Sequence, residues 1–232
     1  GLGGLEITPI YGVKGYEDQF VDYLSPEWTD LLVQSLKIAD SLNMGIDMAN
    51  TSGWPFGGPW IGAENACKRL IFKKYHFNGG REVQRFISYD QKAFVRAVRK
   101  RLNLEDIEYP ISENDSLQQL ALEQVRFDKK LPLISLMAYS NSHNIVDLTD
   151  QVDKNGKLTW DVPPGDWQVY GIFQGWHGKM VERAGPGGEG NVIDHFSKEA
   201  LQKHLHIFDT ALADNGISSL RAFFNDSYEV DD

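Results

Sequence analysis

A helix followed at once by a buried strand is encoded in residues 25–49, which read SPEWTDLLVQSLKIADSLNMGIDMA. Ser25 is a preferred N-cap residue, Pro26 suits the first helical position, and Glu27 places an acid in the first turn. Apolar side chains then recur at helical spacing, at Trp28, Leu31, Leu32, Leu36 and Ala39. We expect this helix to lead directly into a buried strand over 44–49.

A second buried strand is expected at 5–10, so the first fifty residues read strand, helix, strand. This order is the repeating unit of a parallel sheet. Near the other end of the chain, Ser197 is placed to cap a second long helix, and a short apolar strand follows it. The pattern predicts an α/β fold in which four strands lie adjacent and parallel, near 4–8, 44–49, 168–174 and 219–224.

The middle of the chain has a different character. Short β-rich runs are separated by turn signals such as Pro163-Pro164-Gly165-Asp166, which is typical of antiparallel strands. We therefore expect an inserted antiparallel β module over 131–166. It would separate a first part of the main domain, at 1–130, from its continuation at 167–232.

The composition of the 232 residues is that of a globular domain, with 41% hydrophobic and 24% charged side chains. No stretch approaches the roughly 20 apolar residues that a transmembrane helix needs, so no membrane span is expected. The net charge of −10 argues against nucleic acid as the main partner, because phosphate backbones favour basic patches. The single cysteine, Cys67, excludes an internal disulfide framework.

Carboxylates lie in or after the predicted strands and before the second helix, at Glu6, Asp47, Asp194, Asp226 and Glu229. The carboxyl ends of parallel strands carry the active sites of α/β barrels. Glycoside hydrolysis needs two carboxyl groups, one protonated to assist the leaving group and one ionised to activate water or to attack. This set could supply such a pair. Alternatively, Asp226 caps a turn and Glu229 is a solvated loop acid.

An aromatic loop at 50–60 places Trp54, Phe56 and Trp60 among glycines and prolines. Sugar rings stack on aromatic side chains held in this way, so the loop could form a sugar platform. The same rings could instead fill the end of the fold, and the sequence leaves both interpretations open. The six histidines show no zinc-binding spacing. Only His195 is kept as a site candidate, because it lies beside Asp194 in a loop.

Six blocks of the sequence stand out together, in order along nearly the whole chain. They are Gly3–Ile7, Leu24–Trp28, Ser52–Pro59, Pro164–Trp167, Asp194–Ala200 and Asn225–Glu229. In this combination they resemble glycoside hydrolase family 106, the α-L-rhamnosidases, and the SGWPFGGP block at 52–59 is the most specific of them. The resemblance implies an inverting two-carboxylate glycosidase. Glu229 would be its general base and Glu6 the expected partner acid.

The resemblance also implies the fold and the surroundings of the site. The chain would be the N-terminal half of a (β/α)8 barrel, with a calcium ion near the sugar hydroxyls and a periplasmic or extracellular location. The expected partners are a carbohydrate substrate and the remaining barrel and accessory domains of a longer parent chain. We expect further sugar contacts from Trp54, Phe56, Trp60, Asp47, Asp194, His195 and Asp226.

One position keeps a different class of function open. Thr8 stands where a second acid is expected in the family. A non-catalytic carbohydrate-binding protein on the same scaffold is therefore the alternative to a hydrolase. A serine hydrolase has little support, because no Gly-x-Ser-x-Gly motif is present.

Overall fold

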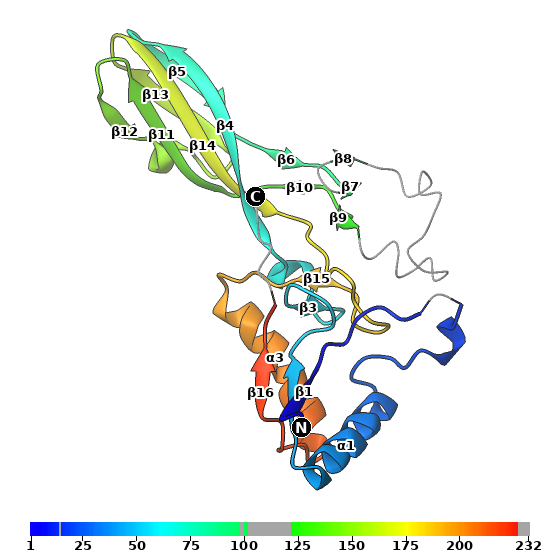
Figure 1. The fold of residues 1–232 in the computed structure, drawn as a ribbon. Helices are drawn as coiled ribbons and strands as arrows, with labels where there is room; N and C mark the ends of the chain where they lie inside the picture. The colour runs from blue at the N-terminus through cyan, green and yellow to red at the C-terminus, as the bar shows by residue number, and fades with distance from the viewer. Residues whose placement is uncertain (14, 98–99, 102–121, 227–232) are drawn as a thin grey trace. The chain divides into compact units, whose positions relative to one another are not determined.

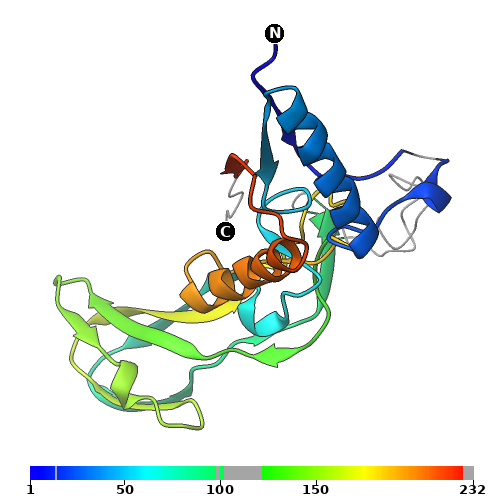
Figure 2. The same ribbon diagram turned by 90° about the horizontal axis from the view of Figure 1, so that it is seen from below.

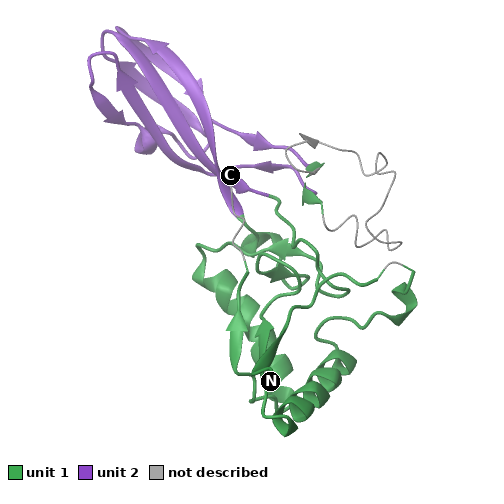
Figure 3. Cartoon of the chain, in the orientation of Figure 1, with its two compact units in different colours: residues 1–67, 94–124, 178–231 green, residues 68–93, 125–177, 232 purple. Residues whose placement is uncertain are grey.

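The structure, a computed structural model, describes residues 1–13, 15–97, 100–101 and 122–226. The chain divides into two compact units (Figure 3). Unit 1 holds the described residues within 1–67, 94–124 and 178–231, and unit 2 those within 68–93 and 125–177. Unit 2 is therefore inserted into unit 1 by two separate segments of chain.

A three-stranded parallel sheet is the centre of unit 1 (Figure 1). Its strands are β1 (Gly4–Ile7), β2 (Gly45–Ala49) and β16 (Ala222–Phe224), in the order β1-β2-β16. Both pairings are parallel, and Asp47 is the Cα partner of Glu6 on one side and of Ala222 on the other. Three of the four strands predicted to be neighbours are thereby confirmed as parallel.

Two capped helices accompany this sheet, α1 (Pro26–Ser41) and α3 (Lys198–Asp214). The Ser25 hydroxyl accepts a hydrogen bond from the backbone N–H of Trp28 at 3.2 Å, and Ser197 does the same for Ala200 at 3.2 Å. Both N-caps expected from the sequence are confirmed. Helix α1 packs along β2, as the view in Figure 2 also shows.

The core of unit 1 follows from the alternation of side chains along β2. Ile46 and Met48 are buried with Leu32 and Leu36 of α1 and with Phe208 of α3. Successive strand residues point to opposite faces of a sheet, so Asp47 lies on the face away from this core. The sheet thus has one apolar face and one face that carries charge.

Shorter elements complete unit 1. They are η1 (Glu17–Gln19), η2 (Ala63–Asn65), and β3 (Gly57–Gly58) paired antiparallel with β15 (Asn191–Val192). A further small sheet has the order β8 (Lys100–Arg101), β7 (Phe94–Ala97) and β9 (Glu123–Val125). Its residues belong to unit 1 except Val125, which belongs to unit 2. Within the described ranges, neither α-helix has the length and apolar character that a membrane crossing requires.

Unit 2 is built from antiparallel strands. One sheet has the order β12 (Ile145–Asp147), β11 (Leu133–Ser140), β14 (Asp166–Trp176) and β4 (Lys68–Asn78). Two further pairs are β13 (Lys157–Val162) with β5 (Arg81–Phe86), and β10 (Lys129–Lys130) with β6 (Asp90–Gln91). The short helix η4 (Thr149–Gln151) follows β12. Its core includes Trp160 and Trp167, whose rings meet edge to face at 5.3 Å between centroids.

The expected half of a (β/α)8 barrel is wrong. In the part of the chain that the structure describes, strands in small sheets predominate and two α-helices are present. The fourth expected parallel strand, at 168–174, lies in β14, which pairs antiparallel with both β4 and β11.

The physical reason is visible along β14, where burial alternates residue by residue. Such alternation is typical of antiparallel sheets, whereas parallel strands covered on both faces are apolar throughout. The antiparallel region also extends beyond 131–166, because β4 and β5 supply partners for β14 and β13.

Candidate functional site

The carboxyl ends of β1, β2 and β16 meet at one edge of the parallel sheet. In open α/β sheets this edge is where ligands bind. Thr8 follows β1, Asn50 follows β2, and Asn225 and Asp226 follow β16. We call the segments 8–12, 50–60 and 182–195 of unit 1 the loop layer.

Hydrogen bonds join the three segments of the loop layer. The Gly53 N–H donates to the Pro9 carbonyl at 2.8 Å, and the Gly185 N–H donates to the buried Ser52 hydroxyl at 2.6 Å. Trp54 and Glu182 exchange two backbone hydrogen bonds, at 3.1 and 2.7 Å. The loops after β1 and β2 and the glycine-rich loop therefore form one hydrogen-bonded assembly.

The glycines of the third segment allow this close approach. A Cβ atom added to Gly188 would lie 2.3 Å from the Ser52 Cβ, and one added to Gly190 would lie 2.1 Å from the Gly58 carbonyl oxygen. Glu189 stands between these two glycines, so its backbone lies directly against the aromatic loop. The glycine-rich run thus allows close packing between loops.

Two of the three loop aromatics pack against a histidine of α3. Phe56 stacks on His204 with 5.2 Å between ring centroids, and the Trp60 indole Nε1 donates to His204 Nδ1 at 3.2 Å. Because Nδ1 accepts, His204 carries its proton on Nε2, which donates to the Asn50 carbonyl at 2.9 Å. Burial lowers the pKa of His204 to about 4, which keeps the ring neutral.

Trp54 has different neighbours. Its ring lies 5.6 Å from the guanidinium carbon of Arg183, and it is only partly buried. His195, the other histidine of the loop layer, stacks on Phe56 at 6.4 Å, and its pKa is lowered chiefly by burial. The structure therefore brings Phe56, Trp60 and His195 together and leaves Trp54 beside a cation.

Two of the predicted acids lie side by side on the charged face of the sheet. Glu6 is exposed and accepts a hydrogen bond from the Thr8 hydroxyl at 3.0 Å. Asp47, its neighbour in β2, accepts from Arg221 Nε at 2.8 Å and from Nη2 at 2.6 Å. These hydrogen bonds lower the pKa of Asp47, although desolvation opposes them. Asp47 is thus engaged in an ion pair that ties β2 to the residue preceding β16.

The remaining predicted acids are dispersed. Asp194 accepts from the Phe196 N–H at 3.0 Å and so caps a turn before α3. Asp226 is exposed after β16. Glu229, the predicted general base, lies outside the described residues.

Two carboxylates of unit 1 were missed by the sequence analysis. Glu189 is half-buried, and this burial is the main cause that raises its pKa. The nearby Asp22 carboxylate also raises the pKa, whereas hydrogen bonds from the backbone N–H groups of Glu189 and Gly187 lower it. Glu64 follows the aromatic loop and pairs with Lys203 at 3.1 Å, next in sequence to His204. A carboxylate flanked by glycines is an unusual pattern, and it could have drawn attention to Glu189.

Among the described residues, the acidic side chains form no calcium site. Calcium takes six to eight oxygen ligands. Over the described ranges, no group of three or more His, Cys, Asp or Glu side chains could hold a metal ion. The calcium ion implied by the resemblance stays a prediction.

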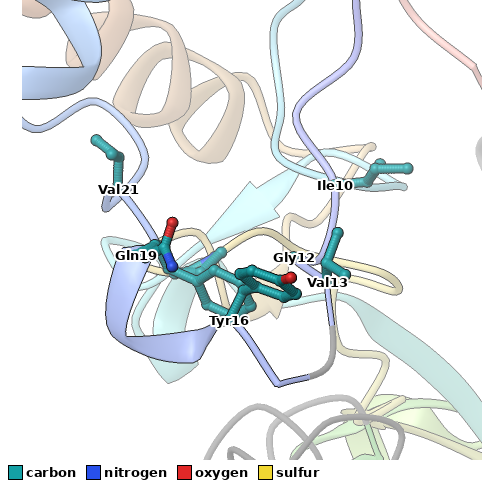
Figure 4. A pocket seen from close by; sticks show the side chains of 8 residues that line it. Ile10, Gly12, Val13, Tyr16, Gln19 and Val21 are labelled. Atoms are coloured by element: carbon teal, nitrogen blue, oxygen red, sulfur yellow. The ribbon is translucent and has the colours of Figure 1, made fainter.

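An open apolar hollow of about 560 Å³ lies along the segment after β1 (Figure 4). Its lining is Ile10, Gly12, Val13, Tyr16, Gln19, Phe20, Val21 and Pro186. No carboxyl or imidazole group is among these residues. The hollow therefore offers no acid or base for glycosidic cleavage, and we assign it no catalytic role.

Comparison with known proteins relates these features to a family. The sequence model of a family described as alpha-L-rhamnosidase, glycoside hydrolase 106, matches residues 1–94 and 121–232. A protein of Formosa agariphila named "Putative beta-glucuronidase" is 25% identical over 244 residues, covering 98% of this chain.

A solved rhamnosidase structure from Novosphingobium sp. PP1Y is similar in fold. It has a TM-score of 0.59 and 16% sequence identity over 99% of this chain. The chain spans 20% of the length of the Formosa protein and 36% of the solved rhamnosidase chain.

Proposed function

We propose that this chain, which belongs to glycoside hydrolase family 106, is part of a glycosidase that removes a terminal sugar from a glycan. The observation that carries the proposal is the family match along both units. The first substrate class to test is α-L-rhamnosides, which the description of the family names. We further propose that the enzyme acts outside the cytoplasm, as the sequence resemblance implies.

The proposed mechanism uses two carboxyl groups with inversion at the anomeric carbon. Glu229 would act as the general base that activates water, and Glu6 would be the partner acid that protonates the leaving oxygen. An inverting pair leaves room for water, with carboxyl groups roughly 6.5–9.5 Å apart. The loop layer at the carboxyl edge of the sheet supports the placement of the site. Glu64 and Glu189 are the rival acids, and burial favours Glu189 as a group that keeps its proton.

Replacing each carboxylate by its amide in the intact protein would test the mechanism. Glu229→Gln should lower kcat by about a hundredfold or more, the usual scale for a positioned base, while KM changes little. The variant of the true acid should lose much less activity on a dinitrophenyl glycoside than on an alkyl glycoside, because a good leaving group needs no proton. We expect this behaviour from Glu6→Gln. Seeing it in Glu64→Gln or Glu189→Gln instead would reassign the acid.

A matched control is available in unit 2. Glu82 is exposed on β5, and Glu82→Gln should leave the activity on both glycosides unchanged. If Glu229→Gln keeps near-normal turnover, the assignment of the base is wrong. If the wild-type protein binds glycosides but never turns them over, the carbohydrate-binding alternative replaces the hydrolase.

The proposed sugar platform is Trp54, with Phe56, Trp60, Asp47, Asp194, His195 and Asp226 as further contacts. Trp54→Ala should raise KM more than it lowers stability, because its ring is partly exposed beside Arg183. Phe56 and Trp60 pack on buried His204, so their alanine variants should lower the melting temperature as well. A large loss of stability with unchanged KM in Trp54→Ala would make that ring a packing residue.

A glucuronidase is the second candidate, in line with the name of the Formosa relative. The observation that favours it is the exposed guanidinium of Arg183 beside Trp54. Parallel assays with 4-nitrophenyl α-L-rhamnoside and 4-nitrophenyl β-D-glucuronide would decide between the two substrate classes.

A further inference from the structure

Arg183 lies beside two aromatic rings of unit 1, at cation–π distance from each. Its guanidinium carbon is 5.6 Å from the centroid of the Tyr11 ring and 5.6 Å from that of the Trp54 ring. Its Nη1 donates a hydrogen bond to the Tyr11 hydroxyl at 2.9 Å. The side chain is exposed, and Tyr11 retains 37% of its accessible surface.

The backbone holds this arrangement at a cost. Arg183 has φ +55°, the left-handed region that residues other than glycine rarely adopt. Its carbonyl accepts from the Tyr11 N–H at 3.0 Å, and the bridge between Glu182 and Trp54 fixes the preceding residue. Unfavourable backbone conformations of this kind concentrate at functional sites and ligand clamps.

Arg183 forms no ion pair within the part of the chain that the structure describes. The acid next to it in sequence, Glu182, pairs with Lys179 at 2.5 Å. An unpaired, exposed arginine in a chain of net charge −10 is a local exception to the overall charge. Among the described residues, the Arg183 charge therefore faces two aromatic rings and no carboxylate.

The two aromatic contacts leave N–H donors of the guanidinium available to a ligand. A guanidinium carries five N–H donors in one plane, and an aromatic ring near it attracts its charge without using those donors. The Tyr11 hydroxyl takes one of the five N–H donors, and the rest of the fork matches the two oxygens of a carboxylate. A sugar ring stacked on Trp54 would lie beside Arg183, so the C6 carboxylate of a uronic acid could meet these N–H groups.

We infer that Arg183, held by Tyr11 and Trp54, recognises the carboxylate of a uronic acid in the substrate. This inference rests on the proposed glycosidase function and names its substrate class as acidic glycans. Arg183 is thus a specificity residue. The proton transfers of hydrolysis remain with the carboxyl groups.

The test compares two sugars that differ in one group, methyl β-D-glucuronide and methyl β-D-glucoside, by titration calorimetry on the intact protein. Wild type should bind the glucuronide more tightly, and Arg183→Met should lose about tenfold or more in that affinity, the lower range for losing a hydrogen bond to a charged group. Glucoside affinity should change less than threefold. Arg81→Met, an exposed arginine on β5, is the matched control and should change neither.

Further variants guard against a change of fold. Arg183→Lys keeps the charge without the planar fork, so it should recover only part of the preference, and Tyr11→Phe should weaken it by a few fold. Equal binding of the two sugars by wild type, or an unchanged preference in Arg183→Met, would overturn the inference. Equal affinity for methyl glucoside 6-sulfate would overturn the assignment to a carboxylate.

The outcomes also separate this inference from the proposed function. Arg183-dependent binding without hydrolysis of any glycoside would refute the glycosidase and keep the carboxylate site. Hydrolysis of neutral glycosides that does not depend on Arg183 would support the glycosidase and refute the carboxylate site.

Discussion

Acid should destabilise unit 1 through the neutral histidine under its aromatic loop. His204 is fully buried; its Nδ1 accepts from Trp60 and its Nε2 donates to the Asn50 carbonyl. A second ring proton would sit on Nδ1 and face the Trp60 N–H, which is itself a donor. We expect His204→Gln, which keeps an amide donor and acceptor but cannot titrate, to remove this acid sensitivity. The variant will start from a lower stability at neutral pH, and the informative quantity is the pH dependence.

The size of the effect follows from the difference between the folded and unfolded pKa values. The pKa of His204 is about 4 in the folded protein, while an unfolded histidine has its ordinary value of about 6.5. Below pH 6.5 the unfolded chain takes up a proton that the folded chain refuses, so the stability contribution is complete above that pH. It is lost progressively between pH 6.5 and pH 4. Between pH 7.5 and pH 5 the loss from this residue is about 2 kcal/mol.

Urea unfolding at the two pH values, followed by tryptophan fluorescence, would measure the loss. Other groups titrate in both proteins, so we compare the loss of stability between the two pH values in wild type with the same loss in His204→Gln. The difference between these two losses isolates the contribution of residue 204. His206→Gln is the matched control, because His206 is exposed on the same helix and should behave as wild type. An equal loss in wild type and His204→Gln would refute the argument. So would a rescue by His206→Gln.

Two further predictions concern contacts that hold the sheet and the loop layer. Asp47→Asn should lower the free energy of unfolding at pH 7, because it removes the ion pair with Arg221. Arg221 lowers the pKa of Asp47, so the difference in stability between wild type and variant should shrink as the pH falls through that lowered pKa. A difference that urea unfolding shows to be independent of pH would contradict this. Gly190→Ala should cost about 1–3 kcal/mol by overpacking against the Gly58 carbonyl, whereas Gly3→Ala, with no atom within 4 Å of its new Cβ, should be silent in thermal melts.

The local parts of the fold could be predicted from the sequence because their signals are local. The Ser25 cap with Pro26 defines the start of α1, and Ser197 that of α3, without reference to distant residues. The parallel pairing of β1 and β2 follows from the strand–helix–strand order. These features depend on residue types and spacing within short segments, which a sequence displays directly.

The expected half of a barrel is wrong, because the described chain consists mainly of small sheets with two α-helices, and the fourth expected parallel strand shows why. The run at 167–173 has the length and apolar content of a barrel strand, but Trp167, Val169 and Phe173 lie on one buried face of an antiparallel sheet. Its partner β4 is about a hundred residues earlier in the chain. Strand pairing at such separation leaves no local signal beyond the period of two, and that period should have outweighed the family expectation.

The candidate site shows the same division between local and distant information. Glu6 and Asp47 could be expected near each other, because they sit in neighbouring parallel strands. That Asp47 would be engaged by Arg221 could not, since the two residues are separated by most of the chain. Glu189 escaped notice because its burial depends on the fit of two glycines against Ser52 and Gly58.

The aromatic loop is where the structure adds most to the sequence. Trp54, Phe56 and Trp60 have the same glycine and proline neighbours, so sequence offered the same two interpretations for all three. Their long-range partners separate them: Phe56 and Trp60 meet His204, which is buried and neutral, whereas Trp54 meets Arg183, which is exposed and charged. A ring fixed on a buried neutral group supports the fold. A ring beside an exposed cation is available to a ligand, and a ligand that uses both the ring and the cation must offer an apolar face and a negative charge.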